Sequence, residues 1–171
     1  MPFTEEIYES WMRETQAKKY EGIFFDFIVP SMQKLKLSRA RVLDVGIGDG
    51  WFEEFLSRKG IKPRLVIGVD SILHAPNSHF VLSDGDFLPF KDGAFDVVVS
   101  FDTVHLLDGV KELVRVVRKN GFLLISDFCN ASTMDSKRAK MLKSFGALKL
   151  LKEGVVGDER ELDYVALFRK I

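Results

Sequence analysis

A glycine-rich loop with an acid just before it is the first part of the sequence whose residue types suit chemistry. Gly46, Gly48 and Gly50 follow a short apolar run, and Asp44 stands two residues before the first of them. Glycines at the end of a strand let the backbone pass close under a ligand, because no side chain obstructs it. Dinucleotide-binding enzymes use the spacing G-x-G-x-x-G, whereas this loop reads G-x-G-x-G. The loop predicts either a structural turn or a nucleotide-like ligand with a carboxylate at the floor of its site.

Further acids follow two later apolar runs. Asp70 ends the run GVD, and the segment SDGDFLPF over 83–90 carries acids at Asp84 and Asp86. A carboxylate at the end of the second strand can accept hydrogen bonds from both hydroxyls of a ribose. An acid at the end of the third can accept one from an adenine amino group. Each acid alone is more often a turn former or a helix cap, but their order after the glycine loop favours a nucleoside site.

The segment SFDTVH over 100–105 holds the groups best suited to proton transfer. His105 can act as a base near neutral pH, although a role as a wall or a hydrogen-bonded orienting group is the favoured interpretation. Asp102 is interpreted as a loop acid. Cys129, the single cysteine, is interpreted as a small buried side chain.

These segments need a scaffold that brings the ends of several strands together. Alternating helices and near-continuous apolar strands predict a doubly wound α/β fold, with a parallel sheet covered on both faces. Ligands bind outside the carboxyl ends of the strands in such sheets. The expected elements are helices over 4–20, 22–37 (interrupted at Pro30), 51–59, 110–120 and 136–145, strands over 41–45, 64–69, 79–82, 95–100 and 122–126, and a hairpin over 147–155 and 161–169.

Composition narrows the class of protein. The chain has 171 residues, 25 basic and 25 acidic, and 46% hydrophobic residues, which fits one folded domain. One cysteine and no Cys/His cluster exclude a disulfide scaffold or a zinc module. No stretch approaches the roughly 18 apolar residues of a membrane span, and the acidic N-terminus is unlike a signal peptide. The sequence predicts a cytoplasmic protein with no metal and no membrane partner.

The motifs together resemble the class I S-adenosylmethionine-dependent methyltransferases, in the branch with an L-P-F motif. The matching segments are VLDVGIGDG, GVD, SDGDFLPF, FDVVVS and KELVRVVRKNG, within about residues 40–127. The resemblance implies a Rossmann-like sheet of seven strands in the order 3-2-1-4-5-7-6, with strand 7 antiparallel. It implies S-adenosylmethionine as the cofactor and S-adenosylhomocysteine as its product. It also implies a cofactor site made of Asp44, Gly46, Ile47, Gly48, Asp70, Ser71, Ile72, Asp84, Gly85, Asp86, Ser100 and Phe101.

Within that resemblance, each segment has a role. The glycine loop lies against the amino-acid part of the cofactor, and Asp44 orients its ammonium. Asp70 holds the ribose, and the spacing to the Leu of L-P-F selects Asp84 rather than Asp86 for the adenine. Ser100 and Phe101 face the methyl group. The family's Pro-Gly-Gly turn is replaced by Lys119-Asn120-Gly121, which can keep the turn because Asn tolerates the left-handed conformation.

The acceptor is left open by the sequence. Only about 20 residues separate the fifth strand from the tail hairpin, so residues 1–38 are expected to form a helical cover over the cofactor-binding sheet of residues 39–171. Tyr8, Trp11 and His105 are the candidate substrate contacts. A small-molecule acceptor is the favoured hypothesis. Alternatives are a tRNA nucleoside, a non-catalytic cofactor-binding subunit, a homo-oligomer or partner that covers the site, and, more remotely, a nicotinamide dehydrogenase.

Overall fold

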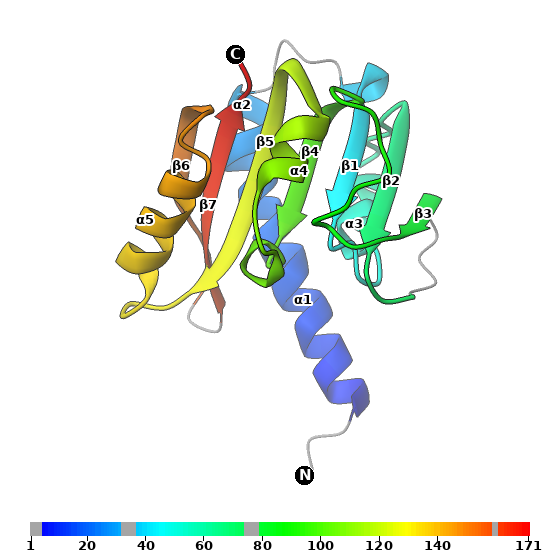
Figure 1. The fold of residues 1–171 in the computed structure, drawn as a ribbon. Coiled ribbons are helices and arrows are strands. Elements are labelled where there is room, and N and C mark those ends of the chain that lie inside the picture. The colour runs from blue at the N-terminus through cyan, green and yellow to red at the C-terminus, as the bar shows by residue number, and fades with distance from the viewer. Residues whose placement is uncertain (1–4, 32–36, 74–78, 159–160) are drawn as a thin grey trace.

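A sheet of seven strands forms the centre of the computed structural model, which describes residues 5–31, 37–73, 79–158 and 161–171 (Figure 1). Side chains are described from residue 10 onward within these ranges. The strand order is β3-β2-β1-β4-β5-β7-β6, and β7 runs antiparallel to both of its neighbours, as predicted. The strands are β1 (Arg41–Val45), β2 (Leu65–Asp70), β3 (His79–Leu82), β4 (Phe95–Phe101), β5 (Val117–Cys129), β6 (Lys149–Asp158) and β7 (Glu161–Arg169).

Most residues of the central strands are apolar because both faces of the sheet are covered. In β1, Val42 packs on one face while Leu43 packs on the other. Its register is parallel to β2, with Leu43 opposite Ile67, and to β4, with Leu43 opposite Val98. Parallel pairing brings the carboxyl ends of β1, β2 and β4 to the same edge, which is where the predicted site residues begin.

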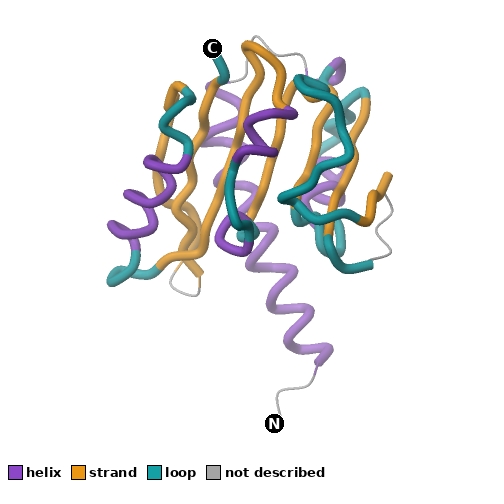
Figure 2. The backbone as a smooth tube through the Cα atoms, viewed as in Figure 1, coloured by secondary structure: helices purple, strands orange, loops and turns teal. Residues whose placement is uncertain are grey.

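Helices lie on both faces of the sheet (Figures 1 and 2). One face is covered by the N-terminal helices and α3, whose Phe52, Phe55 and Leu56 join Tyr20 and Ile23 in an apolar layer. The other face is covered by α4 and α5. The helices are α1 (Glu5–Ile23), α3 (Trp51–Arg58), α4 (Lys111–Val116) and α5 (Met134–Ser144), with a π-helical turn over Phe24–Ile28, a short α2 (Val29–Ser31) and 3-10 turns at Leu37–Arg39 and Val104–Leu106.

The predicted helix over 110–120 is too long, and this prediction is corrected by the structure. α4 ends at Val116, and β5 begins at the next residue, where Val117 pairs with Phe95. The chain then turns at Asn120, whose φ is +61°, so the Asn does take the left-handed conformation. Lys170 donates from Nζ to the carbonyls of Val114 and Val117 at 2.7 and 2.8 Å, which satisfies backbone groups at the helix end.

The N-terminal helix extends past the edge of the sheet. Figure 1 shows α1 running beyond the ends of β1, β2 and β4, on the side where the arrowheads of these strands point. Pro30, expected to interrupt a helix over 22–37, lies in the three-residue α2 after the π-helical turn. Residues 32–36 of that prediction lie outside the described part. In the described residues, no helix is long and apolar enough to cross a membrane.

Candidate cofactor site at the carboxyl edge of the sheet

The glycine loop between β1 and α3 has backbone conformations that residues with side chains rarely adopt. Gly46, Gly48 and Gly50 all have positive φ, at +86°, +53° and +78°. A Cβ at Gly46 would stand 1.9 Å from the hydroxyl oxygen of Thr103, whereas a Cβ at Gly48 would meet nothing within 4 Å. The glycines are therefore required by conformation at all three positions and by close packing at the first.

Asp70 is held in a fixed orientation at the end of β2. Its Oδ2 accepts a hydrogen bond from the amide of Gly48 at 3.0 Å, and its Oδ1 accepts one from the amide of Ile72 at 3.1 Å. A carboxylate oxygen can accept more than one hydrogen bond. Asp70 thus links the glycine loop to the loop after β2 and keeps acceptor capacity for a ligand between them.

The two acids after β3 have different positions. Asp84 is exposed and accepts a hydrogen bond from the amide of Asp86 at 2.9 Å. Asp86 accepts from the amides of Asp108 and Gly109, at 2.8 and 3.1 Å, on its two oxygens. The carboxylate of Asp86 is used to fix the loop after β4. This supports Asp84 as the acid that faces a ligand.

A cleft of about 320 Å³ lies where these loops meet. The size is at the lower end of small-molecule sites, roughly 300–1,000 Å³. The carboxylates of Asp70 and Asp84 offer acceptors for the hydroxyl and amino donors of a nucleoside. Of the predicted cofactor residues, the cleft is lined by Gly46, Asp70, Ser71, Ile72, Asp84, Gly85 and Asp86; Val45, Val69, Ser83, Thr103, Leu106, Leu107 and Asp108 line it as well.

The other predicted cofactor residues lie beneath or beside the cleft. Ile47 packs over Gly68, where a Cβ would stand 2.1 Å from its Cδ1. Ser100 is fully buried and donates to the carbonyl of Val45 at 2.9 Å. The Phe101 ring packs against Tyr20 and Phe52, with centroids 5.5 and 4.9 Å apart. None of these three side chains is among those that line the cleft, and contact of Ser100 and Phe101 with the methyl group stays a prediction.

A match to known proteins agrees with this geometry. Residues 43–125, which hold the glycine loop and both acidic loops, match a protein-family model described as a methyltransferase domain. The strand order 3-2-1-4-5-7-6 is the one that the family resemblance implied. Residues 43–125 are thus similar to methyltransferase domains, and the strand order is the one expected from the resemblance to the class I S-adenosylmethionine-dependent methyltransferases.

Individual relatives cover different parts of the chain. A ubiquinone/menaquinone biosynthesis C-methyltransferase from Stutzerimonas stutzeri is 30% identical over 109 residues, 60% of this chain and 43% of that protein. Phthiotriol/phenolphthiotriol dimycocerosates methyltransferase 1 from Mycobacterium ulcerans is 33% identical over 107 residues, 54% of this chain and 39% of that protein. The PH0226 protein from Pyrococcus horikoshii has the same fold, with a TM-score of 0.63 at 18% identity, covering 98% of this chain and all of that one. The chain therefore spans about two fifths of the length of these two curated relatives.

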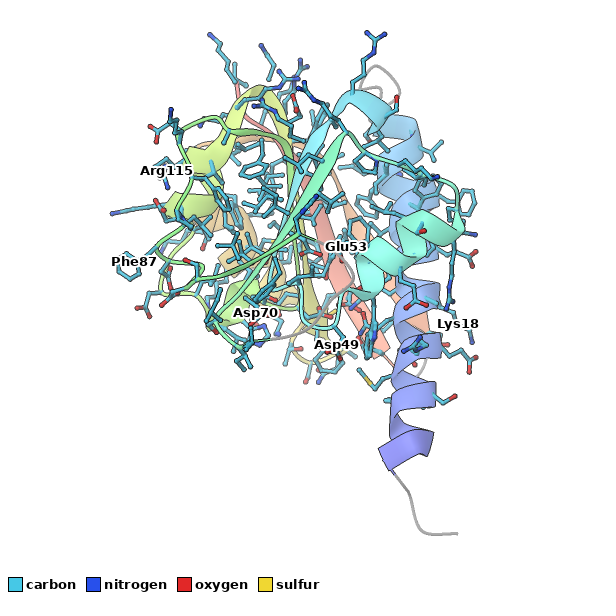
Figure 3. The ribbon with its side chains drawn as sticks, turned by 90° about the vertical axis from the view of Figure 1, so that its right-hand side faces the viewer. Lys18, Asp49, Glu53, Asp70, Phe87 and Arg115 are labelled. Atoms are coloured by element: carbon cyan, nitrogen blue, oxygen red, sulfur yellow. The ribbon has the colours of Figure 1, made fainter. Side chains whose placement is uncertain are left out.

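A pair of buried carboxyl groups lies under the glycine loop, and sequence reasoning found only one of them. Asp44 is 3% exposed, and neither carboxyl oxygen of Glu53 has a hydrogen-bond partner in the described residues. Figure 3 shows Glu53 between α3 and the sheet. Burial raises the pKa of Asp44 well above its usual range, and the Glu53 carboxyl beside it raises it further. Burial also raises the pKa of Glu53. The pair thus favours binding one proton in the absence of a cation.

We expect this pair to make cofactor binding release protons. An ammonium bound beside Asp44 favours the ionised pair, so the pair loses its proton as the ligand binds. Calorimetry of S-adenosylhomocysteine in two buffers of different ionisation enthalpy measures this release near pH 7. Glu53→Gln should abolish most of it, and Glu54→Gln, one residue further along α3, should not. Equal proton release by wild type and Glu53→Gln would contradict the assignment.

A buried ionic cluster joins α1 to the same edge of the sheet. The Lys19 side chain is 2% exposed; its Nζ contacts Asp102 and lies 3.6 Å from Glu161 and 3.7 Å from Asp163. Burial alone lowers the pKa of Lys19, but the charges of Asp102 and Asp163 raise it overall. Asp102, interpreted from sequence as a loop acid, has a φ of +52°. Its pKa is lowered overall, because the neighbouring carboxyl of Asp163 and the charge of Lys19 outweigh its burial.

Asp163, the third acid of this cluster, is expected to make the free energy of unfolding depend on pH. Burial and the neighbouring carboxylate of Asp102 raise the pKa of Asp163 to about 9. Because the folded protein binds this proton more tightly than the unfolded chain, its contribution to stability is complete below pH 4 and is lost as pH rises towards 9. Asp163→Asn keeps the shape of the protonated acid and should flatten the decline of the unfolding free energy between pH 6 and 9. Denaturant titrations across this range test it, and an unchanged slope would contradict it.

The candidate substrate residues are separated by the structure. His105 lies in the 3-10 turn after β4, and its Nδ1 is 3.0 Å from Oδ1 of Asp127, at the end of β5. Trp11 is half-buried on α1 and is not among the residues that line the cleft. Tyr8 also belongs to α1, but its side chain lies outside the described part. Four further residues belong to no sequence motif and are brought near this edge of the sheet only by the fold: Lys19, Glu53, Thr103 and Asp127.

Proposed function

We propose that this protein transfers the methyl group of S-adenosylmethionine to a small-molecule acceptor. The observation that carries the proposal is the cleft at the carboxyl edge, which Gly46, Asp70 and Asp84 line together. The family match supports the cofactor. We propose that Asp70 binds the ribose hydroxyls, that Asp84 accepts the adenine amino group, and that Asp44 and Glu53 attract the ammonium.

The chain's own contribution to the reaction is positioning. The cofactor supplies an activated methyl group, so aligning the nucleophile with it and excluding water can lower the barrier by roughly 7–11 kcal/mol. The fixed carboxylate of Asp70 would hold the adenosine part, and the Lys19 cluster would keep α1 over the methyl-transfer side. We propose that α1 and the following turns, within residues 1–38, cover the acceptor.

Three features support a small acceptor. The two curated relatives are named for methylation of ubiquinone or menaquinone precursors and of phthiotriol lipids, which are small molecules. The segment between Cys129 and Lys149 holds only α5 and short connections, which leaves a limited surface for a macromolecule. The formal net charge of zero also lacks the basic excess of nucleic-acid binders.

Turnover of labelled cofactor tests the proposal. The protein is incubated with methyl-labelled S-adenosylmethionine and a panel of phenols, amines, thiols and carboxylic acids, and S-adenosylhomocysteine is measured. We expect acceptor-dependent formation of S-adenosylhomocysteine that is lost in Asp70→Ala. Binding of the cofactor with no turnover on any acceptor would instead favour a cofactor-binding subunit.

This second candidate function, a cofactor-binding subunit that works with a partner, is favoured by the apolar rim of the cleft. Ile72, Phe87 and Leu106 are 65%, 76% and 73% exposed, and two of them line the cleft directly. Large apolar side chains at such exposure are typical of surfaces that a partner covers. A second copy or another chain bound there would complete the acceptor site. Light scattering during size-exclusion chromatography distinguishes a monomer from a homo-oligomer.

A further inference from the structure

A large groove lies beside α3, away from the cofactor cleft. The connection from β1 to β2 covers residues 46–64 and contains α3, whereas the connection from β2 to β3 covers only residues 71–78. A crossover that contains a helix usually needs a dozen residues or more. Next to α3, the described residues leave a groove of about 560 Å³ over the start of β2. This volume is typical of small-molecule sites, roughly 300–1,000 Å³.

The wall of the groove is apolar. It is formed by α3, by the loop before β2 and by the first residues of β2, and its apolar members are Leu56, Ile61, Pro63, Leu65 and Val66. All of these except Leu56 are only half-buried. A ligand with an apolar body would therefore remove apolar surface from water along the whole wall. Glu53, in the first turn of α3, lines the groove where α3 meets the sheet (Figure 3).

The accessible charge of the groove is positive. Lys62, Arg64 and His79 line it and are exposed. Among the described residues, the side chains of Lys62 and Arg64 have neither an ion pair nor a hydrogen bond. Glu53 is the one acid among the described lining residues, and its carboxyl oxygens are buried beside Asp44. Ammonium and guanidinium groups bind carboxylate oxygens through charge-assisted hydrogen bonds, so the groove favours an anionic ligand.

We propose that this groove is a second binding site, which takes a small organic anion with an apolar body, of the class of medium-chain carboxylates. The carboxylate pairs with Lys62 and Arg64, and the alkyl chain lies along the apolar wall. The groove shares no described lining residue with the cofactor cleft. Binding here is therefore separate from methyl transfer, and the inference does not rest on the proposed function.

Binding is tested by NMR on ¹⁵N-labelled protein titrated with octanoate, with and without saturating S-adenosylhomocysteine. We expect saturable amide shifts at 56–57, 61–66 and 79 under both conditions. From hexanoate to octanoate to decanoate, Kd should fall roughly fourfold for each CH₂ that the wall buries. Octyltrimethylammonium has the same chain and the opposite charge, and should bind at least about tenfold more weakly than octanoate.

Matched variants locate the site. Lys62→Glu should weaken octanoate binding about tenfold or more. Lys119→Glu, the same change at an exposed lysine outside the groove lining, should leave Kd within about twofold of wild type. Ser57→Trp fills the groove from α3 and should weaken binding as strongly as Lys62→Glu, whereas Ser136→Trp on α5 should not. All four positions are exposed, so the variants are expected to fold.

Three results would overturn the inference. They are octanoate binding that leaves the amides of 61–66 unshifted, equal losses of affinity in Lys62→Glu and Lys119→Glu, and displacement of octanoate by S-adenosylhomocysteine. A protein that binds octanoate at the groove but does not bind S-adenosylhomocysteine would support this inference and contradict the proposed function.

Discussion

Asp70→Ala is expected to weaken S-adenosylhomocysteine binding by about 100-fold. The wild-type carboxylate would accept hydrogen bonds from both ribose hydroxyls, and hydrogen bonds to a charged group contribute roughly 1.5–3 kcal/mol each. Losing about 3 kcal/mol corresponds to roughly two powers of ten in Kd. The substitution also removes the acceptor that joins the amides of Gly48 and Ile72, so both loops lose their common anchor.

Two further variants separate these effects. Asp70→Asn keeps one oxygen acceptor for the loops but loses the charge, and we expect an intermediate loss of affinity. Asp26→Ala removes an exposed acid in the π-helical turn, away from the cleft, and should leave Kd within twofold of wild type. Titration calorimetry measures all three, and near wild-type affinity in Asp70→Ala would remove Asp70 from the cofactor site.

Lys19→Met is expected to destabilise the fold by roughly 3–5 kcal/mol, because removing one partner of a buried ion pair leaves an uncompensated buried charge. The ammonium of Lys19 faces Asp102, Glu161 and Asp163, and Asp163 is held protonated near neutral pH. Asp102, whose side chain is 26% exposed, would then be ionised without its cation. Chemical denaturation at pH 7 measures the free energy of unfolding.

The adjacent lysine gives a matched control. Lys18 also pairs with carboxylates, Glu14 and Asp158, at 3.1 and 3.6 Å, but its side chain is 49% exposed. Exposed pairs contribute about 0–1 kcal/mol, so Lys18→Met should cost less than 1 kcal/mol. Adding Asp102→Asn to Lys19→Met should recover part of the loss. Similar effects of the two lysine substitutions would show that the cluster does not hold α1 to the sheet.

The sequence predicts the sheet well because its information is local. Continuous apolar runs such as 41–45 and 79–82 become β1 and β3 with the same bounds, and the glycine spacing requires no tertiary knowledge. The predicted end of the helix that became α4 was wrong, because Val117 continues its apolar pattern while the Val117 backbone pairs with Phe95 in the sheet. The spacing of apolar residues does not show which neighbouring segment the backbone will hydrogen-bond to.

The ionisable groups of the site were harder to predict than its glycines. Lys19 stands beside Lys18 in a polar helix, and nothing in the sequence distinguishes the buried lysine from the exposed one. Asp127 and His105 are 22 residues apart and meet only because β4 and β5 are neighbours. Glu53 looks like a favourable acid in the first turn of a helix, yet its carboxyl lies buried near Asp44.

The central claim is that the carboxyl edge of β1, β2 and β3 holds S-adenosylmethionine, and NMR tests it most directly. Amide spectra of ¹⁵N-labelled protein are recorded during titration with S-adenosylhomocysteine. We predict saturable shifts at 46–48, 70–72 and 84–86, with one ligand bound per chain. Saturation with shifts confined to other parts of the chain, or a folded protein whose spectrum does not change, would contradict the account.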